Sequence, residues 1–126
     1  MTYFFDANLS TKLAQMLQAL GVSVVHLQQH FPKDAPDRQW IPWVGKRGWV
    51  IVTTDGRILQ NPAERRALER AHIIAVFLFR GFSEMTRWAQ ACWLLRWWPR
   101  ITSAVHQAAP GTNLHINRMG RVSELD

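Results

Sequence analysis

The 126-residue sequence is poor in cysteine and in acidic residues, and it has no long apolar run. Its single cysteine, Cys92, excludes a disulfide framework and a thiolate metal cage, and its apolar neighbours predict a buried thiol. No apolar run approaches the ~20 residues needed to span a bilayer. The first residues lack the basic segment of a secretory signal, so we expect a soluble, cytoplasmic protein that does not bind membranes.

Several motifs of known chemistry are also missing. The sequence has no Gly-x-Gly-x-x-Gly, no Gly-Lys-Ser/Thr and no nucleophile elbow, which argues against glycine-loop nucleotide binding and serine-hydrolase chemistry. The histidines do not have the spacing of zinc ligands. They are His26, His30, His72, His106 and His115.

The chain is rich in apolar, aromatic and basic residues. Hydrophobic residues make up 48%, seven residues are Trp, and 15 basic residues against 9 acidic ones give a net charge of +6. This length and apolar content predict one folded domain over residues 1–126. Twelve of the basic residues are Arg, which suits phosphate recognition and favours a polyanionic partner.

The apolar pattern alternates between strand and helix. Continuous apolar or β-branched runs predict strands at 3–5, 22–27, 49–54 and 73–79, with amphipathic segments between them. Such an alternation is typical of an α/β fold with helices on both faces of a mostly parallel sheet of four or five strands. We expect the strand order 2-1-3-4.

The last third of the chain carries a long helical pattern and a less regular end. Ser83 is expected to cap the helix, and Pro99 to break or kink it before a final piece that ends near residue 108. Residues 110–126 are expected to form one more short strand or a loose tail.

Three aspartates are the candidate catalytic and metal-binding residues. Asp6 follows the first strand and Asp55 the third, and these strands are neighbours in the order 2-1-3-4. Ligands bind at the carboxyl ends of parallel strands, where the strand order reverses. Asp37, at the start of the helix before the third strand, can reach the same edge. Three converging carboxylates favour a hard divalent cation, Mg²⁺ or Mn²⁺, and Glu64 is the next candidate ligand.

Each acid also has a structural interpretation. Asp6 could cap the first helix, Asp55 with Gly56 could form a hairpin turn, and Asp37 could be a helix N-cap. Glu64 could be a surface residue that interacts favourably with the helix dipole.

Polar and basic residues surround these acids in the sequence. Asn8 is a candidate neighbour of Asp6, and Lys12 and Arg57 are candidates to hold a phosphate. Three further arginines are predicted to bind RNA. They are Arg38, Arg65 and Arg66.

Four short motifs in this order resemble the PIN-domain superfamily of metal-dependent ribonucleases, and most closely its short PIN-like branch, grouped with VapC-type toxins. They are Phe4-Phe5-Asp6-Ala7-Asn8-Leu9-Ser10, the segment from Asp34 to Ile41, the segment from Val50 to Ile58, and Asn61-Pro62-Ala63-Glu64. The resemblance implies a three-layer α/β/α domain with an acidic pocket built from Asp6, Asp37 and Asp55.

The resemblance also implies an activity and partners. A similar toxin would be an endoribonuclease that hydrolyses RNA with Mg²⁺ or Mn²⁺, and a small cognate antitoxin would silence it; a homodimer is compatible with this. The family commonly has a further acid shortly after the third aspartate, where this chain has Arg57. The alternative is a non-catalytic RNA- or protein-binding module with a vestigial acidic pocket. A receiver-like phosphoacceptor domain fits less well, because adjacent acids after the first strand are missing.

Overall fold

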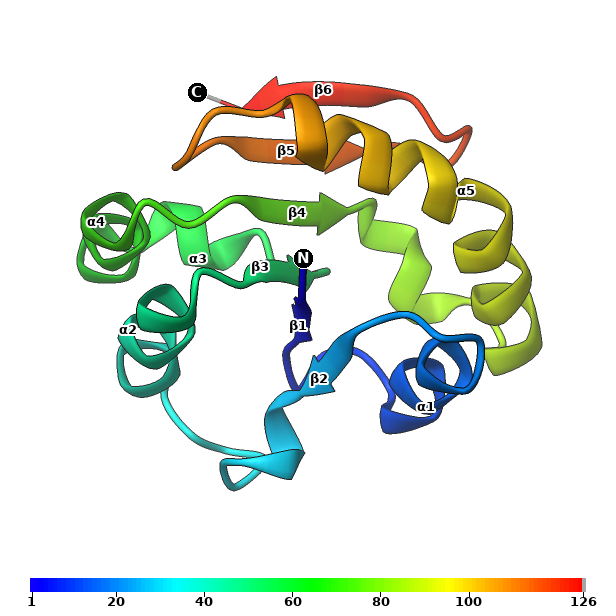
Figure 1. Cartoon of the computed structure of the whole chain (residues 1–126), viewed down its shortest axis with the longest axis horizontal. Coiled ribbons are helices and arrows are strands. Elements are labelled where there is room, and N and C mark those ends of the chain that lie inside the picture. The colour runs from blue at the N-terminus through cyan, green and yellow to red at the C-terminus, as the bar shows by residue number, and fades with distance from the viewer. Residues whose placement is uncertain (126) are drawn as a thin grey trace.

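The computed structural model describes residues 1–125 as alternating strands and helices (Figure 1). The strands are β1 (Tyr3–Phe5), β2 (Val24–His26), β3 (Val50–Thr53), β4 (Ala75–Leu78), β5 (Asn113–Ile116) and β6 (Val122–Leu125). The α-helices are α1 (Thr11–Ala19), α2 (Asp37–Arg47), α3 (Arg57–Gln60), α4 (Pro62–Ala71) and α5 (Arg87–Gln107). Two 3₁₀ turns are η1 (Leu27–Gln29) and η2 (Arg80–Glu84).

The strands form one sheet with the order β2-β1-β3-β4-β5-β6. Strands β1 to β5 are parallel, and β6 runs antiparallel to β5. The α/β class and the order of the first four strands are as predicted. The sheet has six strands rather than four or five, because residues 113–116 and 122–125 pair with each other where one strand or a loose tail was expected.

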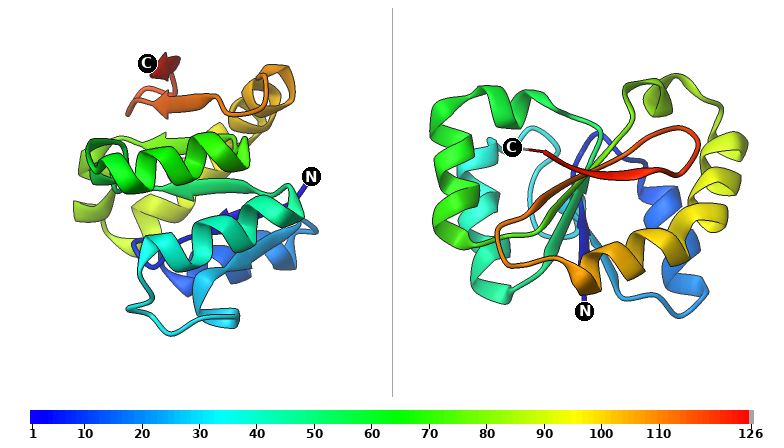
Figure 2. Two further views of the ribbon diagram at one scale, coloured as in Figure 1. Left: turned by 90° about the vertical axis from the view of Figure 1, so that its left-hand side faces the viewer. Right: turned by 90° about the horizontal axis from the view of Figure 1, so that it is seen from above.

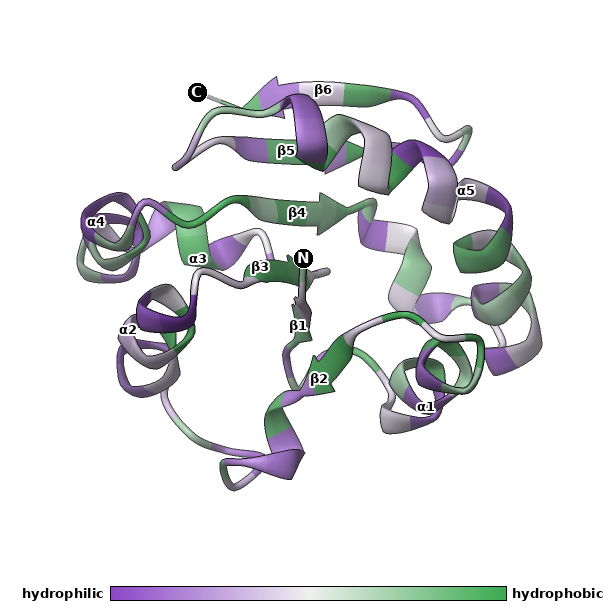
Figure 3. Cartoon of the chain, viewed as in Figure 1, coloured by the Kyte–Doolittle hydropathy of each residue, from purple (hydrophilic) through white to green (hydrophobic). Residues whose placement is uncertain are grey.

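Helices cover both faces of the sheet, which gives three layers (Figure 2). Strand residues alternate between two apolar cores, and the central strands β3 and β4 are buried along their length and apolar except for Thr53 at the end of β3 (Figure 3). Phe5 and Val52 face α1 and α5, whereas Phe4 and Ile51 face α2 and α4. A strand buried on both faces has this continuous apolar character, which explains the strand runs in the sequence.

Helix α5 differs from its prediction at three positions. Thr86 caps it rather than Ser83, and the helix continues through Pro99 to Gln107 without a break. Pro99 is exposed, as is Leu95, the residue whose carbonyl group loses its hydrogen-bond donor, and the buried face holds the helix together. Cys92 lies on the same outer side and is exposed, so the prediction of a buried thiol is wrong. Among residues 1–125, no helix has both the length and the apolar character needed to cross a bilayer.

Candidate functional site

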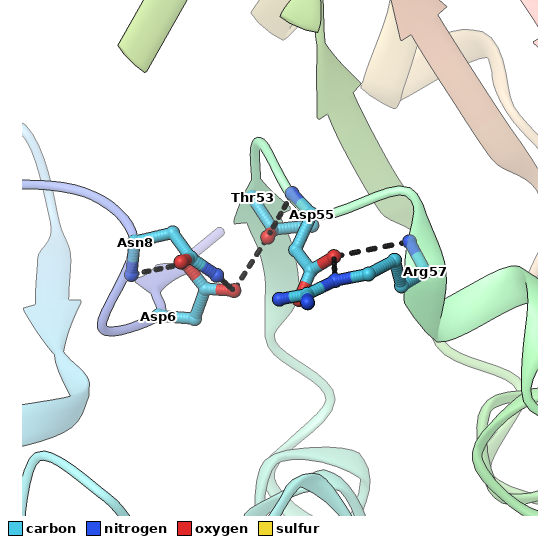
Figure 4. A network of polar contacts seen from close by, with 5 residues as sticks. All are labelled: Asp6, Asn8, Thr53, Asp55 and Arg57. Carbon is cyan, nitrogen blue, oxygen red and sulfur yellow. Dashed lines mark hydrogen bonds and ion pairs between the residues drawn. The ribbon is translucent and has the colours of Figure 1, made fainter.

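A hydroxyl group links the ends of the neighbouring strands β1 and β3 (Figure 4). Phe5 of β1 is level with Val52 of β3, so the next residues, Asp6 and Thr53, are side by side. The Thr53 hydroxyl donates a hydrogen bond to Oδ2 of Asp6 at 2.5 Å, and the Asp55 amide donates to the Thr53 hydroxyl at 2.9 Å. Thr53 therefore connects the two aspartates that were predicted to meet at this edge.

Asp6 is a buried carboxyl group whose hydrogen-bond donors are neutral. It is only 3% exposed, and besides Thr53 it accepts hydrogen bonds from the Asn8 amide at 3.1 Å and the Asn8 side chain at 3.3 Å. Burial raises the pKa of Asp6 from 3.8 to about 7, although the bonds from Thr53 and Asn8 act in the opposite direction. Among residues 1–125 no basic group forms an ion pair with Asp6. Near neutral pH, its buried negative charge is therefore costly unless a proton or a cation binds to it.

Asp55 is held by Arg57 in a two-pronged ion pair. The Arg57 guanidinium donates to Oδ1 of Asp55 at 2.9 Å and to Oδ2 at 3.1 Å, and the Arg57 amide donates to Oδ1 at 3.0 Å. Hydrogen bonding from Arg57 lowers the pKa of Asp55, against the effect of burial. The Arg57 side chain is 83% exposed, so it covers Asp55 from the solvent side.

Asp37 and Glu64 form a second acidic pair on the packed helices α2 and α4. Burial is the main cause that raises the pKa of each carboxyl group. Their side chains are also hydrogen-bonded to each other, which lowers the pKa of Asp37 and raises that of Glu64. Both carboxyl groups therefore keep their protons to a higher pH than an exposed carboxyl group does.

The two acidic groups influence each other. After burial, the charge of Asp55 contributes to the raised pKa of Asp37, and Asp37 contributes in turn to that of Asp6. Even so, within residues 1–125 no three Asp, Glu, His or Cys side chains are arranged as a set that could hold a metal ion. The acids lie near the same edge of the sheet, but Arg57 donates to both carboxylate oxygens of Asp55, and Asp37 interacts with Glu64.

A family model described as a PIN-like domain matches residues 1–80, a stretch that contains all four of these acids. The chain belongs to the PIN-like domain family. Searches among curated proteins and among solved structures found no match. The fold of this family is of the nuclease type, and the match does not extend to the VapC branch that the sequence motifs resemble.

The acidic side chains that the structure describes in this PIN-like domain are of the type that binds Mg²⁺ or Mn²⁺, but they are not arranged as a complete set of ligands. Carboxylate oxygens are the donors that these hard cations prefer. The buried carboxyl of Asp6, which has no basic partner among the described residues, fits such a cation. Asp55 fits only if Arg57 moves away, since the guanidinium holds both of its oxygens.

The other predicted site residues differ in their distance from this edge. Arg57 and Arg65 line a pocket beside Asp55, and Arg65 pairs with Glu69 at 3.5 Å. Lys12 is exposed on α1 and makes no ion pair with an acid of the described residues. Arg38 and Arg66 are exposed on α2 and α4, and their contact with RNA stays a prediction.

Thr53 is the residue of this network that the sequence analysis missed. Its signal was a hydroxyl side chain at the end of an otherwise apolar strand, two residues before an aspartate. A fully buried threonine needs a hydrogen-bond partner, and here the partners are Asp6 and the Asp55 amide.

Proposed function

We propose that this PIN-like domain is a metal-dependent endoribonuclease whose catalytic residues are Asp6, Asp37 and Asp55. The observation that carries the proposal is the buried Asp6 carboxyl group, which neutral donors fix beside Asp55 at the carboxyl edge of the sheet. A buried carboxylate without a basic partner is costly unless it serves a bound cation. A basic chain with a net charge of +6 suits an RNA substrate.

Each residue of the site would have a different role in catalysis. A Mg²⁺ or Mn²⁺ ion on Asp6 and Asp55, with Asp37 and Glu64 nearby, would neutralise phosphate charge and make water more acidic. Thr53 and Asn8 hold the Asp6 carboxylate in one orientation. Arg57 would move from Asp55 to a phosphate oxygen of the substrate, which frees Asp55. The raised pKa values of Asp37 and Glu64 make this pair suited to accept or return a proton.

The test compares two aspartates in an RNase assay. We expect cleavage of single-stranded RNA with Mg²⁺ or Mn²⁺, none in EDTA, and a loss of about 100-fold or more in Asp6→Asn. Asp34→Asn is the matched control, because Asp34 is exposed in the loop before α2. Circular dichroism and urea unfolding check that both variants fold. RNase activity in Asp6→Asn equal to that of the wild type would refute the proposal.

The resemblance to VapC-type toxins extends the proposal to a biological role. We expect the protein to be the toxin of a toxin–antitoxin pair, with a small antitoxin as its protein partner. Expression of the wild type should arrest growth, and expression of Asp6→Asn should not. Growth arrest by both proteins would argue against a role that depends on catalysis.

A second candidate function is a non-catalytic RNA- or protein-binding module. The ion pair of Arg57 with Asp55 favours it, because the guanidinium occupies both oxygens of a proposed ligand. This function predicts that EDTA leaves RNA binding intact, that no cleavage occurs, and that Arg65→Glu with Arg66→Glu abolishes binding.

A further inference from the structure

A pocket of about 690 Å³ opens directly beside Asp55. It lies where α3 and the loop after β3 meet the last strands of the sheet. Helices α2, α3 and α4 cover one face of the sheet on the side of β1, β3 and β4, whereas β5 and β6 extend the sheet further (Figure 1). The pocket lies at the boundary between the part of the sheet that these helices cover and the strands β5 and β6.

The floor of the pocket comes from the sheet. Leu114 and Ile116 of β5 point into the core with α5, so His115 between them points to the opposite face. His115 is level with Phe77 of β4, and both line the pocket together with Leu125 of β6. Phe77 is buried, so the side chains that the floor offers to a ligand are the half-buried imidazole of His115 and the half-buried Leu125.

The rim of the pocket is basic. Arg57, Arg65 and Arg80 line it, and Asp55 is the single acid among its lining residues in the described chain. Arg80 is the exposed first residue of η2, next to the buried Phe79. An imidazole and a leucine side chain under a basic rim suit a nucleobase that carries a phosphate.

We propose that this pocket binds the nucleotide next to the scissile phosphate of a single-stranded RNA, with Arg80 on a phosphate and His115 against the base. The proposal rests on the proposed function, since the pocket shares Asp55 with the acidic site. His115 and Leu125 lie beyond residues 1–80, which the family model matches, so the C-terminal hairpin of this chain builds the subsite.

A second hollow lies on the other side of the acidic site. It has a volume of about 360 Å³ and is lined by Asn8, Lys33 and Arg87 among others. Asn8 holds Asp6, and Thr53 connects Asp6 to Asp55, so the acidic site lies between the two hollows. A strand that fills both passes across the acids, which favours cleavage inside an RNA rather than at its end.

The experiment measures RNA binding without cleavage. Fluorescence anisotropy of a labelled oligoribonucleotide in EDTA is recorded for Arg80→Ala and His115→Gln. Arg70→Ala and His106→Gln are the matched controls, because Arg70 lies near the end of α4 and His106 near the end of α5, both exposed and outside the pocket. We expect about 5- to 20-fold weaker binding for each pocket variant and less than about 2-fold for the controls.

The outcomes separate the subsite from the proposed function. Equal weakening by pocket and control variants, or displacement of the RNA by polyglutamate as readily as by unlabelled RNA, overturns the subsite. Selective weakening in a protein that never cleaves RNA supports the subsite and overturns the proposed function. If the wild type cleaves RNA and Arg80→Ala and His115→Gln bind and cleave it equally well, the subsite alone is overturned. Urea unfolding confirms that His115→Gln folds, and Arg80→Gln provides a second test at an exposed position.

Discussion

The Thr53 hydroxyl at the end of β3 donates a 2.5 Å hydrogen bond to the Asp6 carboxylate at the end of β1. The two residues are 47 positions apart in the chain and are neighbours only because β1 and β3 pair in parallel. The same hydroxyl accepts the Asp55 amide, so one side chain fixes both aspartates of the proposed site.

Thr53→Val should damage the site more than Thr53→Ser does. Valine keeps the shape but removes the donor to Asp6 and the acceptor for the Asp55 amide, whereas serine keeps both. We expect a loss of about 1–3 kcal/mol in the free energy of unfolding for Thr53→Val, and a clear loss of RNase activity. Urea unfolding and the RNase assay measure the two effects. Equal behaviour of the two variants would show that the hydroxyl is dispensable.

Asp6→Asn should change how stability depends on pH. Burial raises the folded-state pKa of Asp6 from 3.8 to about 7. The protonated Asp6 therefore stabilises the fold fully below about pH 4, and this stabilisation is lost progressively as the pH rises to about 7. Asn8 can turn its amide to match the new side chain, so the network can be kept. In EDTA we expect the variant to gain roughly 2–4 kcal/mol relative to the wild type between pH 4 and pH 8. Parallel stability curves would contradict the raised pKa, and Asp34→Asn is the control.

Arg57→Ala should raise the pKa of Asp55 toward its ordinary value, because hydrogen bonding from Arg57 is the main cause that lowers it. Carbon-13 NMR titration of the Asp55 carboxyl group measures this change. Arg57→Lys keeps the charge but not the two-pronged geometry, so an intermediate pKa is expected. If the ion pair competes with a cation, Arg57→Ala also binds Mn²⁺ more tightly, while its affinity for RNA falls. An unchanged Asp55 pKa would show that the pair is weak in solution.

Gly45→Ala should separate the helices that carry Asp37 and Glu64. A Cβ at Gly45 of α2 would lie 2.5 Å from Cβ of Ala71 in α4. The overlap should cost about 1–3 kcal/mol in the free energy of unfolding, partly offset by the better helix propensity of alanine. Urea unfolding measures the loss.

Gly56→Ala is the matched control for Gly45→Ala, because an added Cβ there meets nothing within 4 Å and the backbone is already right-handed. The double variant Gly45→Ala with Ala71→Gly moves the methyl group to the other helix and should recover most of the stability. No recovery would mean that the loss does not come from this contact.

Much of the fold was predictable because its strands are buried on both faces. Such strands read as short apolar runs, and their alternation with amphipathic helices leaves few topologies. The meeting of Asp6 and Asp55 followed from the strand order alone. Their contact through Thr53 did not follow, because it depends on a register of paired strands that an apolar run without alternation does not specify.

Features that depend on which surface packs against the rest of the protein were harder to predict. In the hairpin, β5 alternates between half-buried and buried residues and the edge strand β6 (Val122–Leu125) has no buried residue, so its weak apolar signal was consistent with one strand or a tail. The break expected at Pro99 and the buried thiol expected at Cys92 were wrong because the sequence does not show which side of α5 faces solvent. The pocket with Arg80 and His115 arises only where three strands and α3 meet.

The order of residues alone determined that this chain is a basic α/β domain with aspartates at the ends of its first and third strands, since burial patterns and strand ends are local properties. Only the tertiary structure decided what those aspartates contact. It placed a neutral network around Asp6, an arginine over Asp55 and a second carboxyl group, that of Glu64, beside Asp37. Burial and ion pairing depend on atoms brought together from distant parts of the chain, and these set the charge of each carboxyl group.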